Sequence, residues 1–476
     1  MIKVLNQYFP RRWAVLLLSE SLLILLALTT AVALDSQYSP SAAPLLQVLP
    51  KVVLITLICQ VCLHYGDLYA PEGHSTASEV VARMLQALGL ASLVLAMVYW
   101  LLPQVRLSTS LVVGSVIAIL LLLVGWRRAM DAALRWAQRA YPSAERVLVL
   151  GAGERARALV HELRQHPYLG LELVGMVAED GSSAIEESDA RAGVPGIPGI
   201  PVLGELADVT GVIARHRPSR IVLALEDRSR ALPAQPLMGA WAAGICIEEG
   251  PTLFERVTGR IPLDHIRPSW LFLSDSFYKS GRMRFYKRAS SAVTALLGLI
   301  VLSPALLLAA IAIKLDSPGP VIYRQQRVGL HGRPFDIFKF RSMRTDAERS
   351  TGPVWAQAQD PRITRVGRWL RKLRVDELPQ LFNVLQGTMN IVGPRPERPR
   401  FVEEFRRDIP YYELRHGVAP GITGWAQVSR DYGASIEDAR EKLEYDLFYI
   451  KNLSIWLDLF ILFQTTKIVV LGRGAR

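Results

Sequence analysis

Four long apolar runs fill the first quarter of the chain, and they constrain its fold more than any other feature. Each run has about the 20 residues that an α-helix needs to cross a hydrocarbon layer of about 30 Å. The runs are residues 13–34, 48–65, 80–102 and 107–126. Backbone groups in lipid have no water to bind, so apolar runs of this length predict helices. Residues 1–140 are therefore predicted to form a four-helix transmembrane domain.

The charged residues beside these runs predict how the domain is oriented. Positive charge precedes the first run and follows the fourth, at Lys3, Arg11, Arg12, Arg127, Arg128, Arg135 and Arg139. The connection over residues 35–47 carries none. Because lysine and arginine favour the cytoplasmic side, both ends of the domain are expected in the cytoplasm. Within the first run, Glu20 is expected to form a hydrogen bond to a neighbouring helix.

Residues 141–265 change to strands that alternate with helices, which is typical of a parallel sheet with crossover connections. The stretch RVLVLGAGERARALVHEL indicates a strand, a glycine turn and a helix. Gly151 and Gly153 stand where a dinucleotide-binding turn would have them, and Glu179 ends the next strand. The pattern predicts a Rossmann-like α/β domain. It leaves open whether the glycines serve a bound nucleotide or only the close packing of strand and helix.

A second long apolar segment, residues 289–313, has Ser303 and Pro304 in its middle. Proline removes a helix hydrogen bond and clashes with the preceding turn, and the Ser303 hydroxyl is available to the carbonyl that is set free. Both flanks are basic, so a crossing would carry one of them outside, against the positive-inside bias. We therefore predict a re-entrant helix over residues 287–314, broken at Ser303 and Pro304. The alternative is an ordinary span kinked by proline.

Net charge and the remaining apolar features narrow the classes of partner. A net charge of +12 suits nucleic acid, an anionic membrane surface or phosphorylated substrates.

Cys59 and Cys62 lie in an apolar run and are expected to pack within a helix rather than bind a metal. Near the C-terminus, SIWLDLFILFQTTKIVVLG contains Asp458 and Lys467 and suits an amphipathic helix on the bilayer surface.

The segment WLRKLRVDELPQLFNVLQ, residues 369–386, places two adjacent acids, Asp376 and Glu377, among basic residues. A purely structural interpretation makes Asp376 the N-cap of a helix that has Pro379 in its first turn and ends at Gly387. Capping does not account for the cations on short segments around it. These cations include Lys339, Arg341, Arg371, Arg374 and Arg395. A pyrophosphate requires such a group.

This set of charges suits a carboxylate that attacks phosphorus. Two like charges about 4 Å apart repel by about 4 kcal/mol at an effective dielectric of about 20. Guanidinium groups and a divalent cation offset that repulsion. An aspartate is ionised at neutral pH and needs no general base. Adjacent residues on a helix point about 100° apart, so one acid is expected to attack while the other holds Mg²⁺.

The C-terminal part resembles the bacterial sugar transferases, the monotopic phosphoglycosyl transferases. Nearly all of residues 284–476 takes part, through LLGLIVLSPALLLAAIAIKLDSPGPVIYRQQRVG, FDIFKFRSMRTDAE, DPRITRVGRWLRKLRVDELPQLFNVLQGTMNIVGPRPERP and HGVAPGITGWAQV. Together with the two preceding domains, the chain is similar to the large undecaprenyl-phosphate glucose or galactose phosphotransferases of exopolysaccharide biosynthesis. The resemblance implies an α-rich monotopic catalytic domain over residues 266–476.

The resemblance also implies a role for each matching residue. Asp376 would be the nucleophile that takes a hexose-1-phosphate from a UDP-sugar and expels UMP, and Glu377 would bind Mg²⁺. Ser303 and Pro304 would form the break of the re-entrant helix. The phosphates or the uridine end would be held by Lys339, Arg341, Arg371, Arg374 and Arg395, the last within a turn shaped by Pro394 and Pro396.

The implied partners are a UDP-sugar, undecaprenyl phosphate and membrane lipid, with no nucleic acid. The implied location is the bacterial inner membrane, with the soluble and catalytic domains on the cytoplasmic side. The large soluble insert is compatible with a homodimer. The residues do not identify the sugar.

Two other classes of function account for parts of the sequence. The central domain could belong to a membrane-tethered NAD-dependent epimerase or dehydratase, which the glycine turn favours. The chain lacks the Tyr-x-x-x-Lys pair that such enzymes use for proton transfer. A scaffold without catalysis would explain the N-terminal half alone and would leave the acids and arginines of the C-terminal part without a role.

Overall fold

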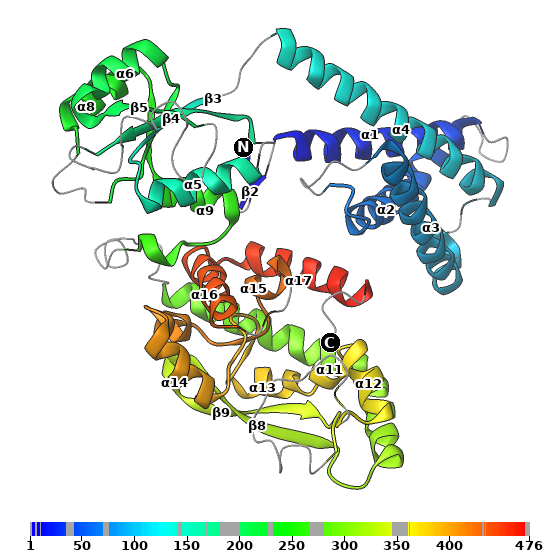
Figure 1. Cartoon of the computed structure of the whole chain (residues 1–476). Coiled ribbons are helices and arrows are strands. Elements are labelled where there is room, and N and C mark those ends of the chain that lie inside the picture. The colour runs from blue at the N-terminus through cyan, green and yellow to red at the C-terminus, as the bar shows by residue number, and fades with distance from the viewer. Residues whose placement is uncertain are drawn as a thin grey trace.

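The computed structural model consists of a four-helix block, an α/β domain and a larger C-terminal domain (Figure 1). The residues that it describes are 2–4, 7–9, 11–34, 42–69, 76–105, 107, 109–140, 145–166, 169–179, 200–226, 232–266, 280–344, 360, 362–430, 433 and 435–471. The domain boundaries at residues 140 and 265 remain predictions.

Four helices occupy the N-terminal quarter, as the apolar runs predict. They are α1 (Arg11–Leu34), α2 (Ala42–Tyr65), α3 (Ala77–Leu101) and α4 (Thr109–Ala140), with the turn η1 (Pro103–Val105) before α4. Among the described residues, α1, α2 and α3 contain segments long and apolar enough to cross a membrane. The fourth helix is longer than its apolar run and continues into an arginine-bearing end.

One face of α1 packs into the block. Residues four apart lie on the same face of a helix, and the buried residues of α1 follow that spacing at Leu16, Glu20, Ile24, Leu28 and Val32. Large apolar side chains on the other side of α1 are exposed, which suits contact with lipid.

The buried stripe of α1 includes one charged residue, Glu20, and its carboxylate is fully buried. Arg127 of α4 donates to it twice, from Nε to Oε1 at 2.5 Å and from Nη2 to Oε2 at 3.0 Å. The Tyr69 hydroxyl, just beyond α2, donates to Oε2 at 2.5 Å. The predicted interhelical hydrogen bond of Glu20 is confirmed. The first half of α1, the turn after α2 and the middle of α4, where its apolar run stops, therefore meet, as four alternating crossings require.

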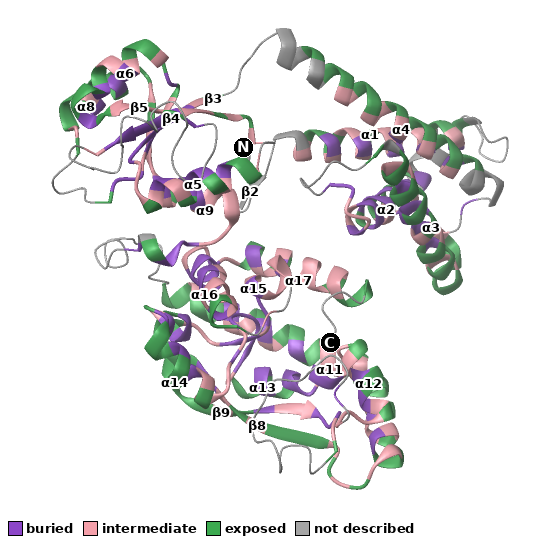
Figure 2. Cartoon of the chain, viewed as in Figure 1, coloured by how far each residue is buried: buried purple, intermediate pink, exposed green. Residues whose placement is uncertain are grey.

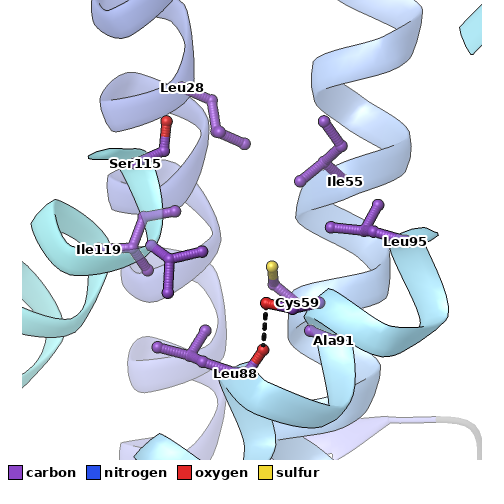
Figure 3. A pocket seen from close by; sticks show the side chains of 10 residues that line it. Leu28, Ile55, Cys59, Leu88, Ala91, Leu95, Ser115 and Ile119 are labelled. Carbon is purple, nitrogen blue, oxygen red and sulfur yellow. Dashed lines mark hydrogen bonds between the residues drawn. The ribbon is translucent and has the colours of Figure 1, made fainter. Parts of the chain in front are cut away.

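A small cavity of about 20 Å³ lies between the four helices (Figure 3). Its lining is almost wholly apolar, and Ser92, one of its few polar residues, donates its hydroxyl to the carbonyl of Leu88 in its own helix at 2.9 Å. Cys59 lines the same cavity, and Cys62 is also buried. Both cysteines belong to the buried core of the block and lie in α2, so they pack within a helix as predicted.

The central domain contains a parallel five-stranded sheet, which confirms the predicted α/β class. Its strands are β3 (Glu145–Leu150), β4 (Leu171–Ala178), β5 (Val202–Glu205), β6 (Arg220–Leu223) and β7 (Cys246–Glu249). The spatial order is β5-β4-β3-β6-β7, so the first strand of the sheet in sequence, β3, lies at its centre and the order reverses there.

Both faces of this sheet are covered by helices. Successive side chains of a strand point to opposite faces, so Val147 and Val149 pack on one side and Leu148 and Leu150 on the other. The first side is covered by α5 (Glu154–Gln165) and α9 (Gly250–Thr258), and the second by α6 (Val209–His216) and α8 (Ala234–Ala242). Shorter turns are η3 (Leu206–Asp208) and η4 (Leu263–His265). The N-terminal hairpin, β1 (Ile2–Val4) and β2 (Gln7–Phe9), lies beside α9 (Figure 1).

The second apolar segment forms one continuous helix, α11 (Gly281–Asp316), with Pro304 inside it. The predicted interruption of the helix at Ser303 and Pro304 is therefore not observed, while a bend at this point remains a prediction. A residue other than proline at position 304 would donate its backbone N–H to the carbonyl of Ile300. Proline has no N–H, and the Ser303 hydroxyl donates to that carbonyl instead, at 2.8 Å. The helix thus continues past its proline because a side chain replaces the lost donor. Whether α11 re-enters or crosses the membrane stays a prediction.

The rest of the C-terminal domain is mostly helical, as expected. Its elements are β8 (Ile322–Val328), η5 (Leu330–Gly332), β9 (Pro334–Phe340), α12 (Arg365–Lys372), η6 (Val375–Glu377), α13 (Gln380–Gln386), β10 (Asn390–Val392), α14 (Pro399–Asp408), η7 (Tyr412–Gly417), β11 (Gly421–Thr423), α15 (Trp425–Ser429), α16 (Ile436–Lys451) and α17 (Ile455–Val470). The strands β8 and β9 form an antiparallel hairpin, and β10 and β11 pair in parallel.

Much of α11 is exposed, whereas much of α16 is buried (Figure 2). Large apolar side chains along α11, such as Ile300, Val301, Leu307 and Leu308, are more than half exposed. By contrast, α16 buries most of its second half in the domain core. An apolar helix with this much exposed surface indicates contact with a membrane, and α11 is among the described helices long and apolar enough to span one.

Candidate active site

The two adjacent acids lie in the short turn between α12 and α13. Arg374 adopts a left-handed backbone conformation with φ 57° and starts η6, which contains Asp376 and Glu377. The helix α13 begins only at Gln380, and no side chain caps it. The predicted N-cap role of Asp376 is therefore wrong, because the turn separates the acid from the helix. The predicted stop at Gly387 is confirmed, with φ 90°.

Glu377 is buried and is bound by two cations. Lys339 of β9 donates from Nζ to Oε1 at 3.1 Å. Arg395 donates from Nη2 to Oε1 at 2.6 Å and from Nη1 to Oε2 at 3.4 Å. Burial works to raise the pKa of Glu377, but Arg395 and Lys339 outweigh burial and hold that pKa well below its usual range. Glu377 is therefore a permanent anion that fixes both cations in place.

Asp376 is in the opposite electrostatic situation. It is 9 % exposed, and its Oδ1 atom is buried without a hydrogen-bond partner in the described structure. Burial raises its pKa, and the neighbouring charge of Glu377 raises it further, while Lys339 and two arginines oppose the rise. A buried acceptor without a donor is uncommon in native structures. This oxygen therefore has no hydrogen bond that a reacting group would have to displace.

The two arginines whose charges oppose the rise in the pKa of Asp376 are Arg371 and Arg374. The charge of Arg374 also lowers the pKa of Glu377. Arg371 donates from Nε to the Ser342 hydroxyl at 2.9 Å. This bond holds the guanidinium beside the acids. Lys339, Arg371, Arg374 and Arg395 are thus brought together around Asp376 and Glu377, as predicted.

Arg341 is placed differently from the other predicted cations. Its guanidinium donates to the carbonyls of Ser317 and Pro318 at 2.7 and 2.8 Å, in the turn after α11. A third bond, at 2.9 Å, reaches the Ser317 hydroxyl. This geometry suits a residue that anchors the end of α11. A role in phosphate binding stays a prediction for Arg341.

The turn that carries Arg395 is fixed along its backbone. Four consecutive carbonyls, from Pro394 to Glu397, each accept a hydrogen bond. The donors are Gly421 N to Pro394 (3.0 Å), Arg415 Nη2 to Arg395 (2.9 Å), Arg327 Nη1 to Pro396 (3.0 Å) and Val328 N to Glu397 (2.9 Å). Because Pro394 and Pro396 also restrict the backbone, the turn holds Arg395 in a position that suits pairing with Glu377.

Sequence reasoning missed the residues that hold the site together. Arg415 is buried and pairs with Asp446 at 2.7 Å. Asn383 is fully buried, and it binds β9 by accepting from Phe338 N at 2.9 Å and donating to the Asp336 carbonyl at 2.7 Å. Asn383 lies within the apolar face of LPQLFNVLQ. A polar residue on such a face could have indicated a buried hydrogen-bonding role.

Mg²⁺ is compatible with the oxygen donors present. This ion is usually bound through one or two carboxylates, with water and substrate phosphates completing its shell. Asp376 offers a buried oxygen without a partner, and Glu377 is an anion beside it. The described residues have no cluster of three or more ligating side chains, so substrate oxygens would have to complete the shell.

The glycine turn of the central domain is occupied by a side chain of the chain itself. At the start of α5, Arg155 N donates to Glu226 Oε1 at 3.2 Å. A Cβ on Gly153 would lie 2.5 Å from the same oxygen. Glu179, the acid that ends β4, accepts from Glu226 N at 2.6 Å. A carboxylate thus takes the place at the helix N-terminus where a dinucleotide phosphate would bind.

Comparison with known proteins assigns these parts to families. A family model described as bacterial sugar transferase matches residues 282–472, and one described as a CoA-binding domain matches residues 64–231. Among curated relatives, the UDP-glucose:undecaprenyl-phosphate glucose-1-phosphate transferase of Xanthomonas campestris pv. campestris is 34% identical over 339 residues, 69% of this chain and 67% of the relative.

Other relatives match a shorter part of the chain. The UDP-N-acetylgalactosamine-undecaprenyl-phosphate N-acetylgalactosaminephosphotransferase of Aeromonas hydrophila is 48% identical over 222 residues, 47% of this chain and 52% of the relative. The UDP-glucose:undecaprenyl-phosphate glucose-1-phosphate transferase of Escherichia coli (strain K12) is 47% identical over 188 residues, 39% of this chain and 40% of the relative. The chain thus matches about half of the length of these two relatives. The matches in and beyond its C-terminal domain show that this protein belongs to the bacterial sugar transferase family.

Proposed function

We propose that the protein transfers a hexose-1-phosphate from a UDP-sugar to undecaprenyl phosphate and releases UMP. The observation that carries the proposal is the contrast between the two acids. Glu377 is bound by Lys339 and Arg395, whereas Asp376 keeps a buried oxygen with no hydrogen-bond partner in the described structure. One acid thus holds cations in place, and the other is left to react.

The reaction proceeds in two displacements. An Asp376 carboxylate oxygen attacks the phosphorus that bears the sugar, and the bond from that phosphorus to the bridging oxygen breaks as UMP leaves with its electron pair. The product is an acyl phosphate between Asp376 and the sugar. A phosphate oxygen of undecaprenyl phosphate then attacks the same phosphorus, and the Asp376 carboxylate is released for the next cycle.

The surrounding cations allow an anion to approach an anion. Repulsion between like charges about 4 Å apart costs about 4 kcal/mol per pair at an effective dielectric of about 20. Lys339, Arg371, Arg374 and Arg395 surround the two acids and offset this repulsion. Glu377 would hold Mg²⁺, which when bound supplies further neutralisation of the pyrophosphate charge.

The site belongs at the cytoplasmic surface of the bacterial inner membrane. The basic flanks of the apolar segments support this placement, and α11 presents exposed apolar side chains beside the domain. We assign α11 to a re-entrant path that bends at Pro304 and begins and ends in the cytoplasm. The acceptor phosphate lies at the same surface, so the enzyme would catalyse the first membrane step of exopolysaccharide biosynthesis.

The sugar is proposed to be glucose or galactose, carried by UDP. The relatives include both glucose and N-acetylgalactosamine transferases by name. A panel of UDP-sugars with detection of UMP therefore identifies which sugar this protein transfers. The NAD-dependent epimerase is not favoured, because Glu226 occupies the phosphate position at Gly153. Purified protein is expected to contain no stoichiometric NAD.

Two conservative substitutions test the assignment of the acids. Asp376→Asn should abolish release of UMP from UDP-sugar even without lipid acceptor, because an amide cannot form the acyl phosphate. Glu377→Gln should lower the rate and weaken the Mg²⁺ dependence. Asp336→Asn is the matched control, since Asp336 is an exposed acid on the same hairpin as Lys339. Substantial turnover by the Asp376 variant would reject the nucleophile.

A further inference from the structure

The turn after α2 contacts the last helix of the C-terminal domain, about 400 residues further along the chain. The Tyr65 hydroxyl donates to the carbonyl of Phe463 in α17 at 3.3 Å. Asp67 forms an ion pair with Lys467, and both side chains are mostly buried. The His64 ring lies 5.0 Å from the ring of Phe463. Polar, ionic and aromatic contacts thus join the four-helix block to α17.

The same turn is held firmly on its other side. Arg127 donates from Nη1 to the carbonyl of Leu68 at 3.0 Å, and its guanidinium lies over the ring of Tyr69. Tyr69 in turn donates to Glu20 at 2.5 Å, and its hydroxyl lies 2.8 Å from the side-chain amide of Gln60. The buried network of the block therefore fixes the surface that α17 contacts. Such a surface is rigid enough to set the position of a docked domain.

The helix α17 also reaches the elements that carry the active site. At its start, Asp458 pairs with Lys287 of α11 at 2.6 Å and accepts from the Tyr449 hydroxyl at 2.7 Å. Near its end, the hydroxyl of Thr465 lies 2.7 Å from that of Thr423 in β11. The carbonyl of Thr423 accepts from Gly393 N at 2.8 Å, directly before the turn of Arg395. One helix thus connects the block, α11 and the Arg395 turn.

We propose that the Tyr65–Tyr69 turn is a docking site for α17 that sets the height of the active site above the bilayer. Asp67 and Lys467 are positioning residues in this scheme, and they act on the step that uses the lipid acceptor. The UDP-sugar arrives from solution, so its half-reaction does not depend on this height. The undecaprenyl phosphate lies at a fixed depth, so its half-reaction does. This inference rests on the proposed function.

The two half-reactions can be measured separately. Asp67→Asn removes the charge but keeps a residue that tolerates the left-handed backbone at this position, φ 57°, and Lys467→Gln removes the partner charge. In full-length protein in nanodiscs, each variant should raise the KM for undecaprenyl phosphate about three- to tenfold. Exchange of labelled UMP into UDP-sugar without acceptor should stay within about twofold of wild type. The double variant should resemble either single variant, because one interaction is lost.

Lys451→Gln is the matched control, since it breaks an ion pair with Glu255 at another contact between domains. It should leave the lipid KM unchanged. Equal losses in both half-reactions, or a similar effect of Lys451→Gln, would overturn the docking proposal.

Amide hydrogen exchange tests docking without any chemistry. Exchange in the last two turns of α17 should be faster in Asp67→Asn than in wild type, and unchanged in Lys451→Gln. Unchanged exchange in Asp67→Asn would overturn the docking site itself. A wild-type protein that releases no UMP from any UDP-sugar would instead contradict the proposed function, and the exchange result would still decide the docking.

Discussion

Arg395 and Glu377 form a two-point ion pair in which Nη2 lies 2.6 Å from Oε1 and Nη1 lies 3.4 Å from Oε2. Lys339 binds the same Oε1 from the hairpin. The carboxylate is thus bound from two separate segments, β9 and the turn after β10. Without the Glu377 carboxylate, the cations on these two segments would be free to move apart. The pair therefore organises the cationic side of the site.

Replacing Arg395 with lysine tests the value of this geometry. Lysine keeps the charge but loses the planar fork that reaches both oxygens. We expect Arg395→Lys to lower kcat/KM for UMP release about 10- to 100-fold, as for other residues that orient a site. Steady-state kinetics checks this. Arg400→Lys, at an exposed arginine of α14, should have little effect, and equal losses in the two variants would contradict the role of the pair.

The pH dependence of UMP release should reflect Asp376. Its pKa is raised by burial and by Glu377, and attack needs the ionised carboxylate. Activity should therefore fall as pH drops through a pKa above the ordinary aspartate range of about 3.9. Glu377 stays ionised through this window, because its pKa is held well below the usual value.

Lys339→Met should move this acidic limb to higher pH, because it removes a cation that lowers the pKa of Asp376. Lys372→Met, at an exposed lysine of α12, serves as the control and should leave the limb in place. A limb that does not move in Lys339→Met would be incompatible with Asp376 as the titrating group.

Breaking the buried pair of the four-helix block should destabilise it strongly. Removing one partner of a buried ion pair leaves an uncompensated charge and typically costs about 3–5 kcal/mol. Arg127→Met should therefore lower the thermal unfolding temperature in detergent, since Glu20 is fully buried. The double variant Glu20→Leu with Arg127→Met should recover part of the loss. Arg128→Met, at the exposed neighbour, should be close to wild type, and a similar loss there would argue against the pair.

The path of α11 can be read by labelling. Leu315 is 83% exposed near the end of the helix, and Arg282 is exposed at its start. Single cysteines at these positions, in a background that lacks the exposed Cys246, should both react with a membrane-impermeant reagent from the cytoplasmic side. Labelling from opposite sides would establish a crossing helix instead.

Patterns with a strong period were readable from the sequence. The apolar runs predicted α1 to α4, and alternating strands and helices predicted the parallel sheet. The C-terminal part of α4 was not predicted, because the helix continues with a polar face to Ala140 after the apolar run ends. Likewise, Pro304 predicted an interruption of the helix, but helical backbone continues through it and the Ser303 hydroxyl binds the free carbonyl of Ile300.

Contacts between distant segments could not be read from local patterns. The sequence grouped the cations around Asp376 and Glu377 by their chemistry, but only the fold shows that Arg341 holds the end of α11. Glu226 follows a strand far from the glycine turn in sequence, so nothing local predicts that its carboxylate reaches Arg155 N. The contact of Asp67 with Lys467 has the same origin, since a turn of one domain and a helix of another create it.

The most direct test is to trap the intermediate. Wild-type protein is incubated with UDP-sugar labelled in the sugar, without lipid acceptor, then quenched and digested, and the labelled peptide is mapped by mass spectrometry. The account predicts a sugar phosphate on Asp376, absent from Asp376→Asn and lost when undecaprenyl phosphate is added. A label on another side chain, or complete transfer with no protein adduct at any time, would contradict it.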